Sequence, residues 1–166
     1  MAELIQNGVP SDLGALQGWN AFKTTIKTDR TYGYVFAIEP TGFMNQFVNI
    51  GEVLNSCAVS IEFRNTGADA EGTIVIQTAE GENINSMFLL SGTDGYQTLK
   101  YDIATPSETR ITGLAFEVRN TTGTQLNIAG ISIQATIVTE VSAADMNDFM
   151  QNCIMFGLDA MKPDVR

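Results

Sequence analysis

The side chains best placed for polar chemistry occur as two glutamate–arginine pairs, each inside a short apolar segment. Glu62 and Arg64 form the first pair, and Glu117 and Arg119 form the second. Alternate residues of a β-strand share a face, so each pair is expected to point to one side while its apolar neighbours point to the core. Together with Gln77 these groups can hydrogen-bond sugar hydroxyls. The alternative is that they are solvated cross-strand pairs, worth roughly a few tenths of a kcal/mol each.

Aromatic residues are the second requirement of a sugar site, because the apolar face of a pyranose stacks on a flat ring. Tyr32 and Tyr34 alternate onto one face of a predicted strand, although packing against the core is an equally open interpretation. The single tryptophan, Trp19, is expected to be buried. The candidate glycan-binding residues are therefore Tyr32, Tyr34, Glu62, Arg64, Gln77, Glu117 and Arg119.

Catalytic constellations are not evident in the chain. It contains no histidine, which removes the usual neutral-pH base and the commonest transition-metal ligand. Several acids lie in predicted turns and can in principle form an acid–base pair, but solvated loop acids are the simpler interpretation. These acids are Asp69, Glu71, Glu80, Glu82 and Asp94. We expect no enzyme, no cofactor and no metal.

Composition and charge limit the classes of partner that the protein is expected to bind. The chain has 166 residues and a net charge of −10, with nine Lys and Arg against nineteen Asp and Glu. No basic stripe exists to neutralise phosphates, so nucleic acid and anionic membranes are not expected partners. The sequence also predicts no signal peptide and no membrane span. Cys57 and Cys153 are not expected to form a disulfide, since a buried free cysteine behaves as a small hydrophobic residue.

Apolar and polar residues alternate in short segments separated by Gly, Asn, Asp and Thr, which is typical of an antiparallel β-sandwich. The predicted strands are 4–6, 18–27, 31–39, 42–48, 56–64, 72–79, 84–90, 96–103, 110–119 and 126–138. The chain also contains an internal echo, in which residues 60–67 and 115–123 each combine a strand with an Arg-Asn-Thr turn. We interpret the echo as two similar hairpins.

After Thr139 the pattern changes to apolar residues at three- and four-residue steps, which predicts an amphipathic helix. The domains are thus a sandwich over 1–139 and a terminal helix over 140–166. The helix either packs on its own sandwich or docks to another chain, including a second copy. The predicted assembly interface is Met146, Phe149, Met150, Cys153, Ile154, Leu158 and Met161.

Three phrases carry a family resemblance: residues 4–8 (LIQNG), residues 16–19 (LQGW), and residues 128–133 (IAGISI) near the far end. Their order resembles carbohydrate-binding modules of families four and nine over about residues 3 to 138. The resemblance implies an all-β antiparallel jelly-roll sandwich in which the two echoed strands share one concave sheet. It also implies a structural calcium, but both acids of the closing phrase are replaced by Ala129 and Gly130, so this calcium is expected to be lost.

These observations favour a non-enzymatic structural or binding module. The leading hypothesis is a bacteriophage virion component, either a capsid decoration or a tail accessory protein, that is made in the host cytoplasm. Its partners would be other virion proteins, its own copies in an oligomer, and a glycan. The alternative is a stand-alone, extracellular carbohydrate-binding module. A hydrolase on the same sandwich is a third possibility and requires a carboxylate pair in a cleft.

Overall fold

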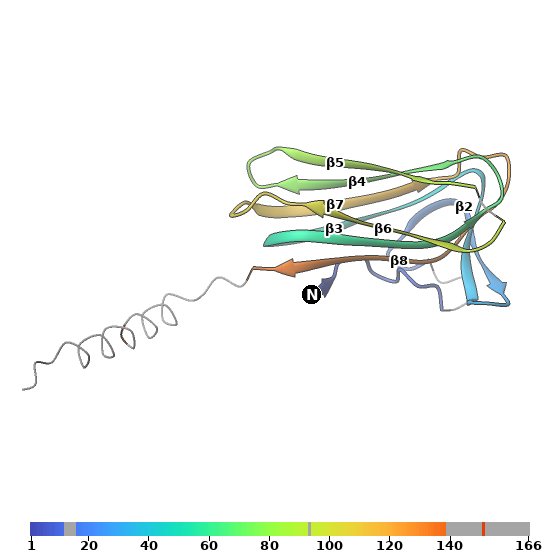
Figure 1. Ribbon diagram of the computed structural model, residues 1–166, viewed down its shortest axis with the longest axis horizontal. Coiled ribbons are helices and arrows are strands. Elements are labelled where there is room, and N and C mark those ends of the chain that lie inside the picture. The colour runs from blue at the N-terminus through green and yellow to red at the C-terminus, as the bar shows by residue number, and fades with distance from the viewer. Residues whose placement is uncertain (12–15, 93, 139–150, 152–166) are drawn as a thin grey trace, which may run out of the picture.

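Eight antiparallel β-strands and the turns between them form the sandwich (Figure 1). This computed structural model describes residues 1–11, 16–92, 94–138 and 151. The strands are β1 (Ala2–Glu3), β2 (Asn20–Asp29), β3 (Gly33–Asn65), β4 (Ala70–Thr78), β5 (Asn83–Leu90), β6 (Gln97–Ala104), β7 (Arg110–Arg119) and β8 (Leu126–Ile137). The predicted all-β fold is confirmed. The predicted strand at 4–6 is wrong: the strand of this segment is Ala2–Glu3, and the chain bends and turns after Leu4. The predicted terminal helix and its seven interface residues lie outside the described residues.

Strand β3 is one continuous element of 33 residues where the sequence predicts three strands. Its middle part, 43–53, pairs with β7, whereas its last part, 56–65, pairs with β6 and β8. The ladder to β7 shifts register between Asn49 and Glu52, next to Gly51 at φ 108°. A glycine at a bulge lets a strand bend sharply without ending, so β3 passes from one layer of the protein to the other.

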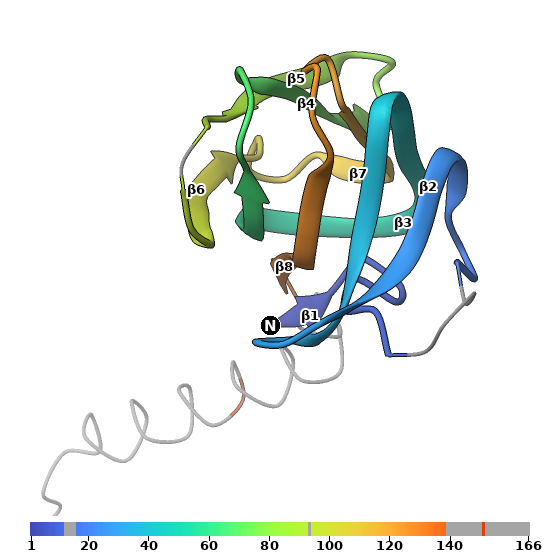
Figure 2. The ribbon, with the colours of Figure 1, turned by 90° about the vertical axis from the view of Figure 1, so that its right-hand side faces the viewer.

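Two layers result, and they are seen end-on in Figure 2. The β4 sheet contains the start of β2, the middle of β3, then β7, β4 and β5. The β8 sheet contains the rest of β2, the first part of β3, then β8, the last part of β3 and β6, with β1 at the side of β8. This is a β-sandwich, in which each sheet has one face on the core and one face outward.

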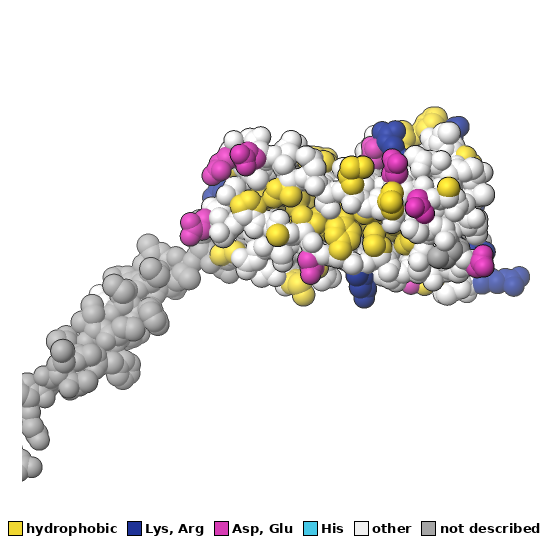
Figure 3. Space-filling view, turned by 45° about the horizontal axis from the view of Figure 1, so that its top comes forward, with side chains coloured by type: hydrophobic (Ala, Val, Ile, Leu, Met, Phe, Trp, Pro, Cys, Tyr) yellow, Lys and Arg dark blue, Asp and Glu magenta, His cyan; other side chains and the backbone are white. Residues whose placement is uncertain are grey.

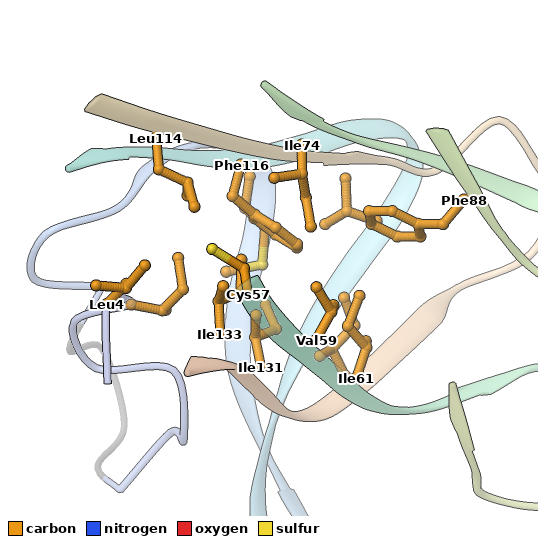
Figure 4. Packing of buried hydrophobic residues seen from close by; sticks show 14 of the residues in the cluster. Leu4, Cys57, Val59, Ile61, Ile74, Phe88, Leu114, Phe116, Ile131 and Ile133 are labelled. Atoms are coloured by element: carbon orange, nitrogen blue, oxygen red, sulfur yellow. The ribbon is translucent and has the colours of Figure 1, made fainter. Parts of the chain in front are cut away.

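The core lies between the sheets and is filled by alternate residues of both (Figure 4). Leu114, Phe116 and Ile74 enter it from the β4 sheet, and Val59 and Ile133 enter it from the β8 sheet (Figure 4). All of these side chains are at most 2% exposed. The alternation of apolar residues that predicted the strands therefore marks the inward faces.

The opening segment is fixed to the core by side-chain hydrogen bonds. Trp19 is buried, as expected, and its indole Nε1 donates to the carbonyl of Asn7 at 3.0 Å. The buried Gln46 side chain donates to the carbonyls of Gln6 and Gly18 at 2.9 and 3.0 Å, and its oxygen accepts the Gln6 N–H at 2.8 Å. The residues of the two opening phrases thus close one side of the sandwich.

The internal echo corresponds to a pair of matching turns. Asn65 and Asn120 are fully buried where β3 and β7 end, and each donates its amide to the carbonyl of another strand: Leu90 at 2.9 Å and Ile38 at 2.7 Å, respectively. Each side-chain oxygen accepts the N–H two residues further on at 3.0 Å. Because asparagine can bond the backbone on both sides of a turn, one residue type ends both strands.

Candidate functional site

The outward surface of the β4 sheet, here called the β4 face, combines polar and apolar side chains in regular rows. One row across β3, β7, β4 and β5 is Asn45, Glu117, Thr73 and Met87, and the next is Phe47, Ala115, Val75 and Asn85. Directly opposite residues in antiparallel strands have Cβ atoms about 5 Å apart. Each row therefore presents a band of neighbouring side chains across the strands.

A hollow of about 370 Å³ lies at the centre of the β4 face. Its outward lining residues are Asn45, Phe47, Thr73, Val75, Ala115 and Glu117. The floor is low because Ala115, Thr73 and Val75 are small, whereas Phe47 is 53% exposed at one margin. An exposed aromatic ring beside a shallow floor is a surface on which a flat, partly apolar ring can lie.

The carboxylate of Glu117 is held from two directions. One oxygen accepts from Arg119 Nε, and the other accepts from Asn45 Nδ2 at 3.3 Å. The Arg119 guanidinium lies over the ring of Phe43, with its Cζ 5.2 Å from the centroid, which restrains it by a cation–π contact. Such an exposed ion pair contributes little to stability. Its effect is to orient one acceptor group and the remaining guanidinium donors beside the hollow.

A larger hollow of about 560 Å³ lies on the outward surface of the β8 sheet, here called the β8 face. Ala58, Ser60 and Ser132 form its low floor, and Lys100 and Asp102 stand at its β6 side. No aromatic ring faces outward in the rows that line it. We therefore take the smaller hollow, with its exposed ring and ordered polar groups, as the candidate ligand site despite its lower volume.

A tyrosine cluster joins the β2–β3 turn to the start of β6 beside the β8 face. The rings of Tyr32 and Tyr96 have centroids 4.6 Å apart, and the Tyr96 hydroxyl donates to Asp29 Oδ2 at 2.8 Å. The Tyr32 hydroxyl donates to Glu62. Partial burial and the bond to Asp29 raise the pKa of Tyr96 to about 12. Both hydroxyls are already hydrogen-bonded within the protein, so this cluster stabilises the contact between the β2–β3 turn and the start of β6.

The predicted glycan-binding residues are divided between the two faces. Tyr32, Glu62 and Arg64 belong to the β8 sheet side, whereas Gln77, Glu117 and Arg119 belong to the β4 face. Tyr34 is half-buried and packs against the core. The expectation that the two echoed strands share one sheet is wrong: residues 60–65 pair with β6 and β8, whereas 115–119 pair with β4 and the middle of β3. The echo reflects a shared turn and not a shared sheet.

Several residues of the hollow were not singled out by sequence reasoning. Asn45, Thr73 and Ala115 become neighbours only because β3, β4 and β7 pair in one register. Their alternation with buried residues marks them as outward-facing, and that was the only signal available in the sequence. The order of the strands brings these residues together, and no local pattern in the sequence indicates that order.

In the segment where the family resemblance implies calcium, one described carboxylate is held by protein hydrogen bonds. Glu3 lies beside β8, and its carboxylate accepts from the Ile5 and Ile133 N–H groups and from the Ser132 hydroxyl. No group of three His, Cys, Asp or Glu side chains suited to a metal occurs among the described residues. Calcium takes about six to eight oxygen ligands, which include carboxylates, carbonyls and waters. Glu3 instead joins the N-terminal segment to β8 through protein hydrogen bonds.

The fold is that of a carbohydrate-binding-module-like β-sandwich. One similar structure is the second module of carbohydrate-binding family 16, with a TM-score of 0.57 and 14% identity. The match covers 81% of this chain and 99% of the family 16 module. The family 61 module TmCBM61, solved in complex with β-1,4-galactotriose, has a TM-score of 0.54 and 9% identity over 82% of this chain and 100% of its own. Both likenesses show the fold alone.

A third similar structure is the enzymatically active domain of tailspike protein 4 from bacteriophage CBA120. Its TM-score is 0.60 at 11% identity, over 81% of this chain, and this chain spans 21% of the tailspike chain. No protein-family model and no curated protein sequence matches the chain. In the part of the chain that the structure describes, no helix has the length and apolar character needed to cross a membrane.

Proposed function

We propose that this protein is a non-catalytic glycan-binding module whose ligand lies in the hollow of the β4 face. The observation that carries the proposal is the exposed Phe47 ring beside a floor of small side chains, next to the oriented Asn45, Glu117 and Arg119 groups. The ring offers a stacking surface, while the amide, carboxylate and guanidinium offer acceptors and donors for hydroxyl groups. The similarity to sandwiches that carry this function supports the same conclusion.

We also propose that the protein binds the glycan without cleaving it. Glycoside hydrolysis generally uses two carboxyl groups that flank the bond being cleaved. Among the residues that line the hollow, Glu117 is the single carboxylate, and it is engaged by Arg119 and Asn45. The arrangement suits binding without bond cleavage.

Replacing Phe47 or Arg119 by alanine is expected to weaken glycan binding about tenfold or more, since each removes one of the two kinds of contact. Affinity is measured for the full chain by calorimetry, with neutral polysaccharides selected on a glycan array. Val9→Ala and Lys100→Ala are matched controls, because they remove an exposed apolar group and a cation away from the β4 face. They are expected to leave affinity unchanged.

Two results would contradict this proposal. Absence of binding to every polysaccharide tested would remove the glycan-binding function itself. Loss of binding in Lys100→Ala with full binding in Phe47→Ala would place the ligand on the β8 face instead.

We also propose that the module belongs to a bacteriophage particle, as a capsid decoration or tail accessory protein. The support is the likeness to a domain of a phage tailspike chain, together with the binding role proposed above. We expect the protein to co-sediment with particles purified on a density gradient from cultures that produce it, and to be detected there by mass spectrometry. Recovery only as free protein in the medium would favour the stand-alone extracellular module.

A further inference from the structure

The edge strands of the two sheets differ in how they are protected from pairing with another chain. An unpaired strand edge presents N–H and C=O groups that can pair with another strand, and proteins usually block it with charge, bulges or short length. Among the described strands, β1 has 2 residues. Strand β2 contains Lys23 and Lys27, and it is bulged between Phe22 and Thr24. Strand β6 presents Lys100 and Asp102 outward. Each of these edges is blocked.

Strand β5 has none of these features. It ends the β4 sheet, and its described pairing is with β4 alone, in an unbroken register from Ala70–Leu90 to Gln77–Asn83. Its eight residues, NINSMFLL, include no charged residue and no proline, although the chain has a net charge of −10. A regular, uncharged edge of this length is the kind that pairs with another strand.

Two outward side chains in the second half of β5 are large and apolar. Met87 is 75% exposed and Leu89 is 53% exposed. A band of hydrophobic side chains crosses the face drawn in Figure 3, which is turned forward from the top of Figure 1, where β4 and β5 lie. Apolar side chains on an open strand edge are stabilised when a second strand covers them.

We infer that β5 is a self-association edge, and that its partner is β5 of a second copy of this chain. The absence of charge favours a copy, because a two-fold axis places residues of β5 against other residues of the same strand, and an uncharged strand has no self-repulsion there. Antiparallel pairing about that axis joins the two β4 sheets into one continuous sheet.

This geometry has a consequence for the ligand hollows. A two-fold axis perpendicular to the sheet keeps both β4 faces on the same side of the dimer. If the proposed glycan site is correct, two hollows therefore face one surface, and a polymeric ligand can occupy both, which raises the apparent affinity. The pairing itself does not depend on the glycan proposal.

The full chain is tested by sedimentation velocity and light scattering from about 1 to about 200 µM, the range in which weak interfaces dissociate. We expect a concentration-dependent increase to twice the monomer mass. Met87→Lys is expected to halve the mass of the largest species, because it places a positive charge near the middle of the pairing strand in both copies. Val9→Lys is the matched control, because Val9 is 68% exposed away from β5 and the substitution adds the same charge. The mass of the Val9→Lys species is expected to equal that of the unmodified chain.

Melting temperatures of both variants, measured at the lowest concentration, verify that each is folded. An unmodified chain that stays at the monomer mass throughout would overturn the inference. An oligomer that persists unchanged in folded Met87→Lys would also overturn it, because assembly would then use another surface. Neither result would bear on glycan binding, which is measured separately with Phe47→Ala.

Discussion

Replacing Phe116 by alanine is expected to lower the free energy of unfolding by about 3 to 5 kcal/mol, the usual cost of removing a fully buried aromatic ring. Phe116 is 1% exposed and contacts two other buried aromatic rings. Its ring lies 5.9 Å from Trp19 in an edge-on arrangement and 5.9 Å from Phe88 in a stacked one. The deletion therefore leaves a cavity between β5, β7 and the opening segment. Urea denaturation followed by tryptophan fluorescence measures the change.

Phe47→Ala is the matched control for this substitution. It removes the same side chain, but from the exposed β4 face, and it is expected to change the free energy of unfolding by less than about 0.5 kcal/mol. The two substitutions distinguish an aromatic residue that stabilises the fold from one that binds the ligand. The Phe47→Ala protein is expected to lose glycan affinity but to keep its stability. A cost below about 1 kcal/mol for Phe116→Ala would contradict the close packing described for the core.

Asn120→Ala is expected to cost about 2 to 4 kcal/mol, because it leaves buried backbone groups without hydrogen-bond partners. The lost partners include the Ile38 carbonyl at 2.7 Å and the Thr122 N–H at 3.0 Å. Asn120→Asp is expected to be at least as damaging, since a carboxylate cannot donate to the Ile38 and Thr124 carbonyls and its charge is buried. Denaturant titration at neutral pH measures both variants.

The neighbouring Thr121→Ala serves as the control, because Thr121 is exposed and its hydroxyl donates to the Asp69 carbonyl at 3.2 Å, near the upper limit for a hydrogen bond. Its expected cost is below about 0.5 kcal/mol. Equal losses in Thr121→Ala and Asn120→Ala would indicate that the turn as a whole, and not the asparagine network, determines stability. The same network around Asn65 predicts that Asn65→Ala behaves like Asn120→Ala.

The candidate site was only partly predictable. Glu117, Arg119 and Gln77 were identified as outward polar residues, and the structure places them on the β4 face. Glu62 and Arg64 have the same local pattern as Glu117 and Arg119, but they lie on the opposite side of the sandwich. Nothing in either segment distinguishes the two, because both end in the same asparagine turn. The neighbours of Glu117 in the hollow depend on strand order, which is set by pairing between distant segments.

By itself, the sequence determined the elements and their inward faces. A period of two residues is a local property, so apolar alternation was enough to predict which segments between 18 and 138 are extended and to separate most core residues from outward ones, but not that three of these segments join in β3. Tertiary structure decided which strands are neighbours, and hence that Phe47 and Glu117 share a hollow while Glu62 does not. It also decided that the uncharged β5 lies at an edge. The physical reason is that pairing partners are selected by the packing of the whole sandwich, which no single segment encodes.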